Sequence, residues 1–230
     1  MKGIPFDSGA ILVVDKPLNW TSFDVVKKIR YAICKHYNLK KIKVGHAGTL
    51  DPLASGVVVI CTGKKTKIID QFINESKDYT GEIRLGSTTP SFDLETEIDK
   101  EFILPALNDN ILKKISNNFT GNILQIPPIF SAKRINGKRA YQYARNNEEI
   151  VLKPNSVTIH NLELKVVNKN TLSFNCHCSK GTYVRSLARD IGLFLDSGGH
   201  LRSLKRIKSG NFTIEMAKSI DEWIDIIKAS

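Results

Sequence analysis

The longest purely apolar stretches of this chain are only five residues long, and this shortness sets the tightest limit on what the chain can form. They run from Ala10 to Val14 and from Val57 to Cys61. A helix that crosses a bilayer needs about 20 apolar residues, so neither stretch can span a membrane. Short apolar runs of this kind are typical of buried strands. We therefore expect a globular protein with strands in its core.

Helix-like and strand-like segments follow one another without regular alternation. Strands are expected at 10–15, 57–61, 79–85, 156–167, 171–178 and 201–207, and helices from about Asp24, near 107–115, at 182–196 and at 219–228. A basic helix start is expected at Lys64, and Asn136-Gly137 is a tight-turn signal. Thr21 with Asp24 and Ser219 with Glu222 match capping boxes. The irregular order disfavours a doubly wound parallel sheet. It predicts an α+β fold in which helices pack against a mixed sheet, as one domain over 1–230.

The chain is strongly basic, with 34 Lys and Arg against 23 Asp and Glu, a net charge of +11. An excess of this size favours a polyanionic partner such as nucleic acid, although a basic protein that is merely soluble would show it too. Opposite the apolar stripe of the helix that starts near Asp24 lie Lys27, Lys28, Arg30 and Lys35. They are either a solvated face or phosphate contacts, and the sequence does not separate the two.

The four cysteines give no sign of a metal site. No C-x-x-C pair occurs, and alternation places His177 on the opposite face from Cys176 and Cys178. We expect reduced thiols and no zinc. The amino terminus lacks the features of a signal peptide, so a cytoplasmic location is expected.

A loop rich in glycine, from Gly45 to Gly56, places a single carboxylate, Asp51, directly before the apolar strand 57–61. Loops positioned by a rigid strand often carry chemistry. The glycines do not form a nucleotide-binding motif, and Lys64 after Gly63 lacks the P-loop arrangement. Taken alone, Asp51-Pro52 is a turn dipeptide whose carboxylate more often bonds its own backbone.

The loop, read as G-H-x-G-x-L-D-P-x-A-x-G, resembles the signature of the TruB pseudouridine synthases at every fixed position. The resemblance continues in the family's order. It covers Asp15-Lys16-Pro17 with Thr21-Ser22, Lys77-Asp78-Tyr79 with Gly86 and Asp93, Gln125 to Pro128 with Ser131-Ala132-Lys133 and Gly137 to Arg145, Gly181 to Leu187, and Leu204-Lys205-Arg206. One departure is Asn19, where the family usually has Gly, although Asn tolerates left-handed backbone better than most residues.

The resemblance implies the pseudouridine synthase catalytic fold, with a mostly antiparallel sheet flanked by helices, and an isomerase that converts uridine 55 in the T loop of tRNA to pseudouridine. Asp51 would be the catalytic carboxylate, acting on a flipped-out uridine. Tyr79 would stack on the uracil, and Arg185 would pair with Asp51. The expected substrate-binding residues are His46, Lys16, Leu204, Lys64, Lys133 and Arg139. The chemistry requires no metal or cofactor, and attack at C6, attack at C1′ and a glycal route all stay open.

The T arm of tRNA is the expected partner. The segment of about 127–145 would form a flap over the arm, and basic residues would contact its phosphates: Lys64, Lys65, Lys67, Lys133, Arg134, Lys138 and Arg139. The chain stops soon after the last motif, so no carboxyl-terminal PUA module is expected. We also expect a monomer with no obligate protein partner.

Three other functions compete with this one. An RNA-binding or RNA-folding module would share the basic surface but has no need of Asp51, Tyr79 and Arg185 together. A synthase for ribosomal RNA, or a guide-RNA-dependent relative, would share the motifs. A nucleotide-dependent enzyme built on Lys64 would need a phosphate-binding motif that the sequence lacks.

Overall fold

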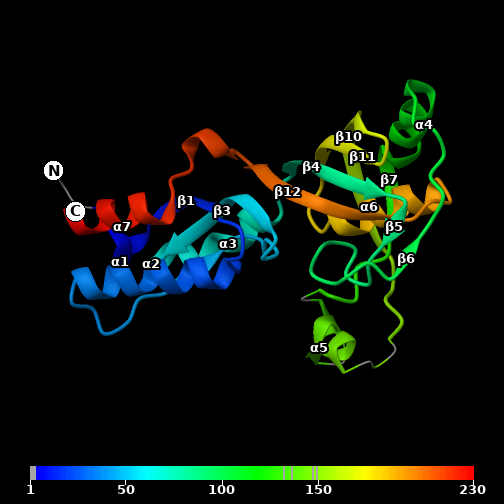
Figure 1. The fold of residues 1–230 in the computed structure, drawn as a ribbon. Coiled ribbons are helices and arrows are strands. Elements are labelled where there is room, and N and C mark those ends of the chain that lie inside the picture. Colours follow the sequence, from blue (N-terminus) through cyan, green and yellow to red (C-terminus); the bar gives the residue numbers. More distant parts are fainter. Residues whose placement is uncertain (1–3, 132, 136, 147, 149) are drawn as a thin grey trace. The chain divides into compact units, whose positions relative to one another are not determined.

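A computed structural model of the protein describes residues 4–131, 133–135, 137–146, 148 and 150–230. The chain divides into two compact units (Figure 1). The first consists of Met1–Tyr79 with Leu204–Ser230, and the second is Thr80–Ser203. Two compact units can still form one catalytic domain, so the expectation of a single domain over 1–230 stays a prediction.

The sheet of the first unit is built around a central buried strand, β3 (Ala54–Thr62). Its neighbours are β1 (Ile11–Lys16), which is antiparallel to it with Ile11 opposite Cys61, and the end of β12 (Gly199–Ser209), which is parallel with Leu204 opposite Ala54. Short strands extend it: β2 (Val44–His46) beside β3 and β13 (Phe212–Thr213) beside β12. Residues 57–61 are fully buried, which confirms the strand predicted from their apolar run.

Helices cover this sheet because each has one apolar face. In α2 (Ser22–His36), Val25, Ile29 and Ile33 are buried at helical spacing. The capping boxes expected before α2 and before α7 (Ile220–Ala229) are both present. Helix α7 contacts both α2 and β1. The remaining short helices of this unit are α1 (Phe6–Gly9), α3 (Ile69–Ile73) and the 3₁₀ segments η1 (Gly63–Ile68) and η2 (Ile214–Met216).

The second unit has its own antiparallel strands, in the order β4 (Lys77–Leu85), β11 (Thr171–Cys178), β10 (Asn155–Asn168) and β7 (Gly121–Gln125). Its helices are α4 (Asp109–Phe119), α5 (Ala140–Arg145) and α6 (Val184–Phe194). Two short strand pairs complete it: β5 (Ser87–Thr88) with β6 (Lys100–Glu101), and β8 (Arg134–Ile135) with β9 (Lys138–Arg139).

Most expected elements are confirmed, and the mixed, mostly antiparallel sheet flanked by helices agrees with the predicted α+β class. The helix expected to begin at Lys64 starts as the 3₁₀ segment η1 and continues as α3 only from Ile69. Strand β7 was not predicted, because its apolar residues are few. Asn136 of the predicted tight turn lies outside the described residues. Among the described residues, no helix is long and apolar enough to cross a membrane, and no cluster of three or more metal-binding side chains occurs.

Candidate active site

The loop that carries Asp51 is bound to the start of helix α2. Ser22, the first residue of that helix, is buried, and its Oγ accepts a hydrogen bond of 2.8 Å from the Leu50 backbone N–H. The same hydroxyl donates to the Leu50 carbonyl over 3.2 Å. After Asp51 the chain turns into β3, and the Ala54 N–H donates to the Asp51 carbonyl over 3.0 Å. Asp51 therefore sits in a turn fixed on both sides.

Lys16 binds the other side of this turn. It is fully buried at the end of β1, and its Nζ donates to the carbonyls of Trp20 (2.6 Å), Pro17 (2.9 Å) and Pro52 (3.5 Å). The Asn19 N–H also donates to the Pro52 carbonyl, over 2.8 Å. Asn19 has φ of 64°, in the left-handed region that favours glycine, so Asn at this position adopts a backbone conformation that a glycine there would readily take.

Lys16 also places a charge near Asp51. Burial lowers the pKa of Lys16 to about 8, and the negative charge of Asp51 is the largest influence opposing that shift. Attraction between two charges acts on both of them. A protonated Lys16 therefore stabilises the carboxylate of Asp51 as an anion, which a nucleophile or a base has to be.

Arg206 is the residue of this site that the sequence did not single out, although it belongs to the last matched motif. It is 1% exposed, and its guanidinium donates to the carbonyls of Val57 (2.7 Å) and Gly48 (3.2 Å). Alternation along β12 could have found it, because Arg206 shares a strand face with Leu204. Gly56 has φ of +102°, and any side chain there would overlap the Arg206 backbone.

His46 and Leu204 complete the first unit's part of the site. His46 lies on β2 opposite Ile60, and burial lowers its pKa, with Arg206 adding to the effect and a hydrogen bond that the ring donates to the Gly48 backbone opposing it. This environment favours the neutral form of the imidazole. Leu204 is buried beside Ala54, and Tyr79 is buried on β4.

Arg185 belongs to the second unit, where it is 4% exposed near the start of α6. Its guanidinium donates to the carbonyls of Phe130 (2.9 Å) and Ser91 (3.2 Å), and its Nε lies 3.5 Å from a carboxylate oxygen of Asp93. Asp93 is part of a matched motif, and its pairing with Arg185 was not foreseen. The expected pairing of Arg185 with Asp51 joins residues of different units and stays a prediction.

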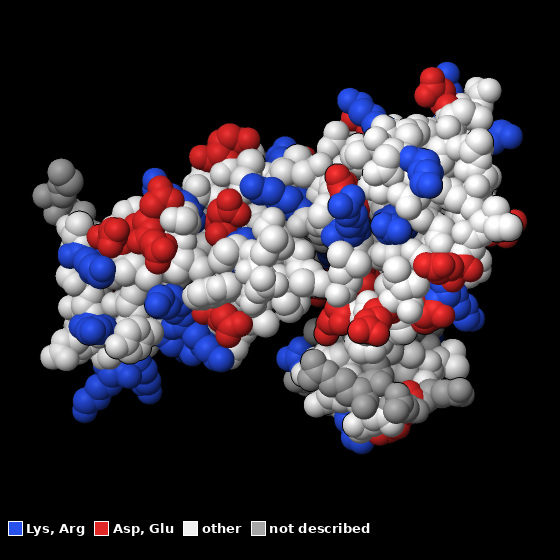
Figure 2. All heavy atoms as spheres, viewed as in Figure 1, with Lys and Arg blue, Asp and Glu red and all other residues white. Residues whose placement is uncertain are grey.

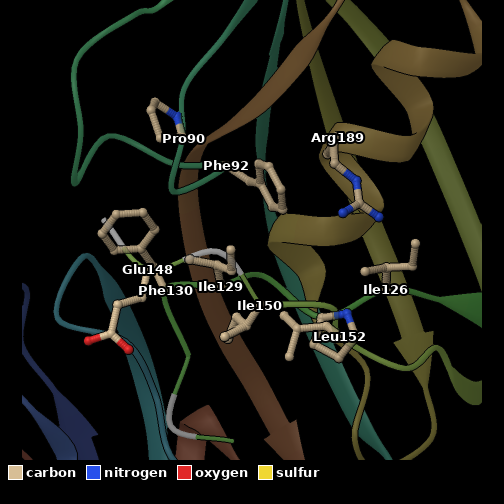
Figure 3. Close-up of a pocket in the computed structure, with 10 residues that line it drawn as sticks. Pro90, Phe92, Ile126, Ile129, Phe130, Glu148, Ile150, Leu152 and Arg189 are labelled. Atoms are coloured by element: carbon tan, nitrogen blue, oxygen red, sulfur yellow. The ribbon is translucent and has the colours of Figure 1, made fainter. Parts of the chain in front are cut away.

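A cavity of about 490 Å³ lies next to Arg185 in the second unit, since Phe130 both lines it and binds the guanidinium. Figure 3 shows apolar side chains gathered around it. Arg189 stacks on the Phe92 ring, 4.8 Å from the ring centre. The lining residues are Pro90, Phe92, Ile126, Pro127, Ile129, Phe130, Glu148, Ile150, Leu152 and Arg189. No sequence pattern predicted this cavity, because its walls come from four separate segments.

The expected RNA-contacting residues are less constrained. In the segment of about 127–145, the Lys133 ammonium donates to the Asn155 side chain over 2.8 Å, and the Lys133 carbonyl accepts from the Ala140 N–H. Arg139 is exposed at the end of β9, and Lys64 is exposed on η1. Ala132, which belongs to the third matched motif, lies outside the described residues.

Comparisons with known proteins cover nearly the whole chain. A family model described as TruB family pseudouridylate synthase (N terminal domain) matches residues 35–184. A second, described as tRNA pseudouridylate synthase B C-terminal domain, matches residues 185–228. A protein of Phocaeicola vulgatus named tRNA pseudouridine synthase B is 49% identical over 96% of this chain and 95% of its own length. A protein of Parabacteroides distasonis with the same name is 48% identical over 97% and 95%.

Among solved structures, the chain is similar to one titled as a Cbf5-Nop10-Gar1 complex, with a TM-score of 0.72 and 25% identity. The match covers 96% of this chain and 54% of that one. A structure of an H/ACA RNP bound to a substrate RNA matches with a TM-score of 0.68 and 24% identity. These likenesses show the shared fold.

Proposed function

The chain belongs to the TruB family of pseudouridylate synthases, and from that premise we propose that it converts uridine 55 in the T loop of tRNA to pseudouridine with Asp51 as the catalytic carboxylate. Relatives that match over almost their full length, at 46–49% identity, are named tRNA pseudouridine synthase B. The identity to these relatives extends over the residues that the two family models match, which supports a shared reaction and a shared class of substrate.

The observation that carries the proposal is the construction of the Asp51 turn. Ser22 and Lys16 bind it through the residues on either side of Asp51, and Lys16 supplies an opposite charge. A turn that only connected β2 to β3 would need neither a buried lysine nor a buried arginine nearby. Burying a charge is costly even when it is hydrogen-bonded, so two buried cations here suggest a functional role. A fixed anion next to a cation suits nucleophilic or basic catalysis.

The reaction breaks the N1–C1′ bond of uridine and forms a C5–C1′ bond, after which the proton on C5 is lost. Substrate and product are isomers, so no oxidant or reductant takes part. The Asp51 carboxylate either attacks C6 of the uracil or C1′ of the ribose, or removes a proton on a glycal route. In each case the base has to stay bound while it is detached and turned.

The other matched residues receive supporting roles. Tyr79 stacks on the uracil, and Arg185 pairs with the Asp51 carboxylate, since arginine stays charged and presents two donors to a carboxylate. His46, as a neutral ring, takes part in extruding and stacking loop nucleotides. Leu204 closes the apolar wall, and Lys16 keeps the Asp51 turn in place.

The substrate has to be the T arm with its target base flipped out, because the reacting atoms are inaccessible inside a folded loop. Unstacking costs a few kcal/mol, and phosphate contacts from Lys64, Lys133 and Arg139 offset it. We propose that the enzyme works as a monomer in the cytoplasm, without a metal, a cofactor or an obligate protein partner.

A guide-RNA-dependent synthase is the second candidate, because the Cbf5 complexes share the fold. The sequence favours the stand-alone enzyme. Identity is 25% to the chain of the Cbf5-Nop10-Gar1 complex, but 49% to a protein named tRNA pseudouridine synthase B.

The decisive experiment measures tritium release from an unmodified tRNA transcript that carries 5-tritiated uridine, with EDTA present and no other protein or RNA. We expect the parent protein to release tritium and Asp51→Asn to bind the transcript without releasing any. A transcript with cytidine at position 55 serves as the matched substrate control. If neither protein releases tritium and both bind, the chain is an RNA-binding module.

A further inference from the structure

Helix α2 exposes a line of alternating aromatic and basic side chains on its outer face. Phe23, Lys27, Tyr31 and Lys35 follow one another at intervals of four residues, roughly 6 Å of helix each. All four are exposed, and the two rings are the unusual members, with 52% of Phe23 and 64% of Tyr31 open to solvent. We call these four residues the α2 stripe.

Charges and rings of the stripe are paired. The Lys27 ammonium lies 4.9 Å from the centre of the Phe23 ring, and that of Lys35 lies 5.9 Å from the centre of the Tyr31 ring. Such cation–π pairs keep a positive charge and an aromatic surface at one place. The stripe therefore offers a flat ring and a cation in turn along its length.

A surface groove of about 510 Å³ runs beside the stripe. It is lined by Asn19, Trp20, Asp24, Lys27, Lys28 and Tyr31. The segment 20–43 contains seven Lys or Arg residues and one acidic residue, Asp24, whose carboxylate accepts hydrogen bonds from Thr21 and caps the helix. In Figure 2, Lys and Arg gather along the edge where Figure 1 places α2.

We propose that the α2 stripe and its groove bind unpaired nucleotides of an RNA. Bases would stack on Phe23 and Tyr31, and phosphates would contact Lys27, Lys28 and Lys35. Proteins that hold single-stranded nucleic acid combine these two features, a basic track and aromatic platforms for successive bases. The choice of RNA as the partner rests on the proposed function, which makes an RNA the substrate.

An anionic membrane surface is the other partner that a basic helix with aromatic residues could fit. A helix that lies in a membrane interface buries a broad apolar face in the lipid. The apolar face of α2 already faces the protein core, where Val25, Ile29 and Ile33 have no exposed surface. What α2 leaves outside is a narrow line of alternating rings and charges, which matches nucleotides better than lipid.

The test uses a fluorescent oligoadenylate of about ten nucleotides, a length within the usual range for such sites. It contains no uridine, so its binding does not depend on the isomerase activity. We expect the full-length protein to bind it and Tyr31→Ala and Phe23→Ala each to weaken binding about tenfold. Lys27→Ala should lower the slope of log affinity against log salt by about 0.7.

Lys113→Ala is the matched charge control, because Lys113 is exposed on α4 in the other unit and should leave binding unchanged. In a Trp223→Phe background Trp20 is the single tryptophan, and we expect oligoadenylate to quench its fluorescence. Equal affinity of the parent and Tyr31→Ala within twofold, or an equal loss in Lys113→Ala, would overturn the proposal. So would stripe-dependent binding to anionic vesicles with no binding to oligoadenylate.

A failure of this test with tritium release intact would leave the proposed function standing. Binding that depends on the stripe, with no tritium release by the parent, would support the stripe and reject the isomerase.

Discussion

Two segments of this chain, one in each unit, are expected to meet the same RNA, and they are built in opposite ways. The Asp51 loop, residues 45–56, is fixed by buried side chains from three other elements, with Ser22, Lys16 and Arg206 all bonded to its backbone. The expected flap, residues 127–145, presents an exposed Arg139, and its Lys133 bonds to a neighbouring strand. The difference supports the proposal that precise positioning is concentrated around Asp51, while the segment expected to form a flap contributes charge.

The largest effect should come from filling the space at Gly56. In Gly56→Ala the new methyl group overlaps the Arg206 backbone at a residue with φ of +102°, and we expect a loss of about 4 kcal/mol in the free energy of unfolding. Gly137→Ala in the flap is the matched control. It also has positive φ but open space around it, so about 1 kcal/mol is expected. Urea unfolding measures both, and equal losses would remove the contrast.

Arg206→Met should have the next largest effect. It removes the guanidinium that donates to the buried carbonyls of Gly48 and Val57, which costs about 3 kcal/mol of stability. Because Gly48 belongs to the Asp51 loop, we also expect kcat to fall at least tenfold with KM little changed. Steady-state kinetics over a range of tRNA concentrations separates kcat from KM. Arg202→Met is the control, since that arginine is about half exposed and its loss should leave kcat unaltered.

A pH profile tests Lys16. Its pKa is lowered from 10.5 to about 8, so the folded protein loses this proton first and kcat should fall about tenfold per pH unit above 8. Between about pH 8 and pH 10.5 the unfolded chain binds more protons than the folded one. The stability of the parent should therefore rise with pH relative to Lys16→Met across that window, by at most about 3 kcal/mol. If kcat of Lys16→Met fell above pH 8 in the same way as kcat of the parent, a group other than Lys16 would be responsible for the fall.

The smallest effects are expected in the flap. Arg139→Ala and Lys133→Ala should each raise KM a few-fold, leave kcat unchanged and reduce the salt dependence of tRNA binding by about one phosphate contact. The matched control is Lys169→Ala, between β10 and β11, far from any matched motif in the sequence. A fall in kcat with KM unchanged would mean that the flap positions the reacting base as well as the arm.

Part of the site was predictable because it is local. The pattern around Asp51 places the carboxylate in a glycine-rich loop before a buried strand, and the capping residues Thr21 and Ser219 fix two helix starts. The Lys16 contacts were not predictable from spacing, because Pro52 lies 36 residues further along the chain. Arg206 lies 149 residues from its acceptor Val57, and alternation alone cannot say which core a buried arginine enters.

The sequence by itself determined the class of fold, the family and the identity of the candidate carboxylate, since these depend on local periodicity and on motifs a few residues long. The tertiary structure decided which groups surround that carboxylate. It buried Lys16 and Arg206, brought Asp93 to Arg185 and left Phe23 and Tyr31 exposed. The physical reason is that burial and hydrogen bonding depend on segments distant in the chain, which meet only when the strands pair and the helices cover them.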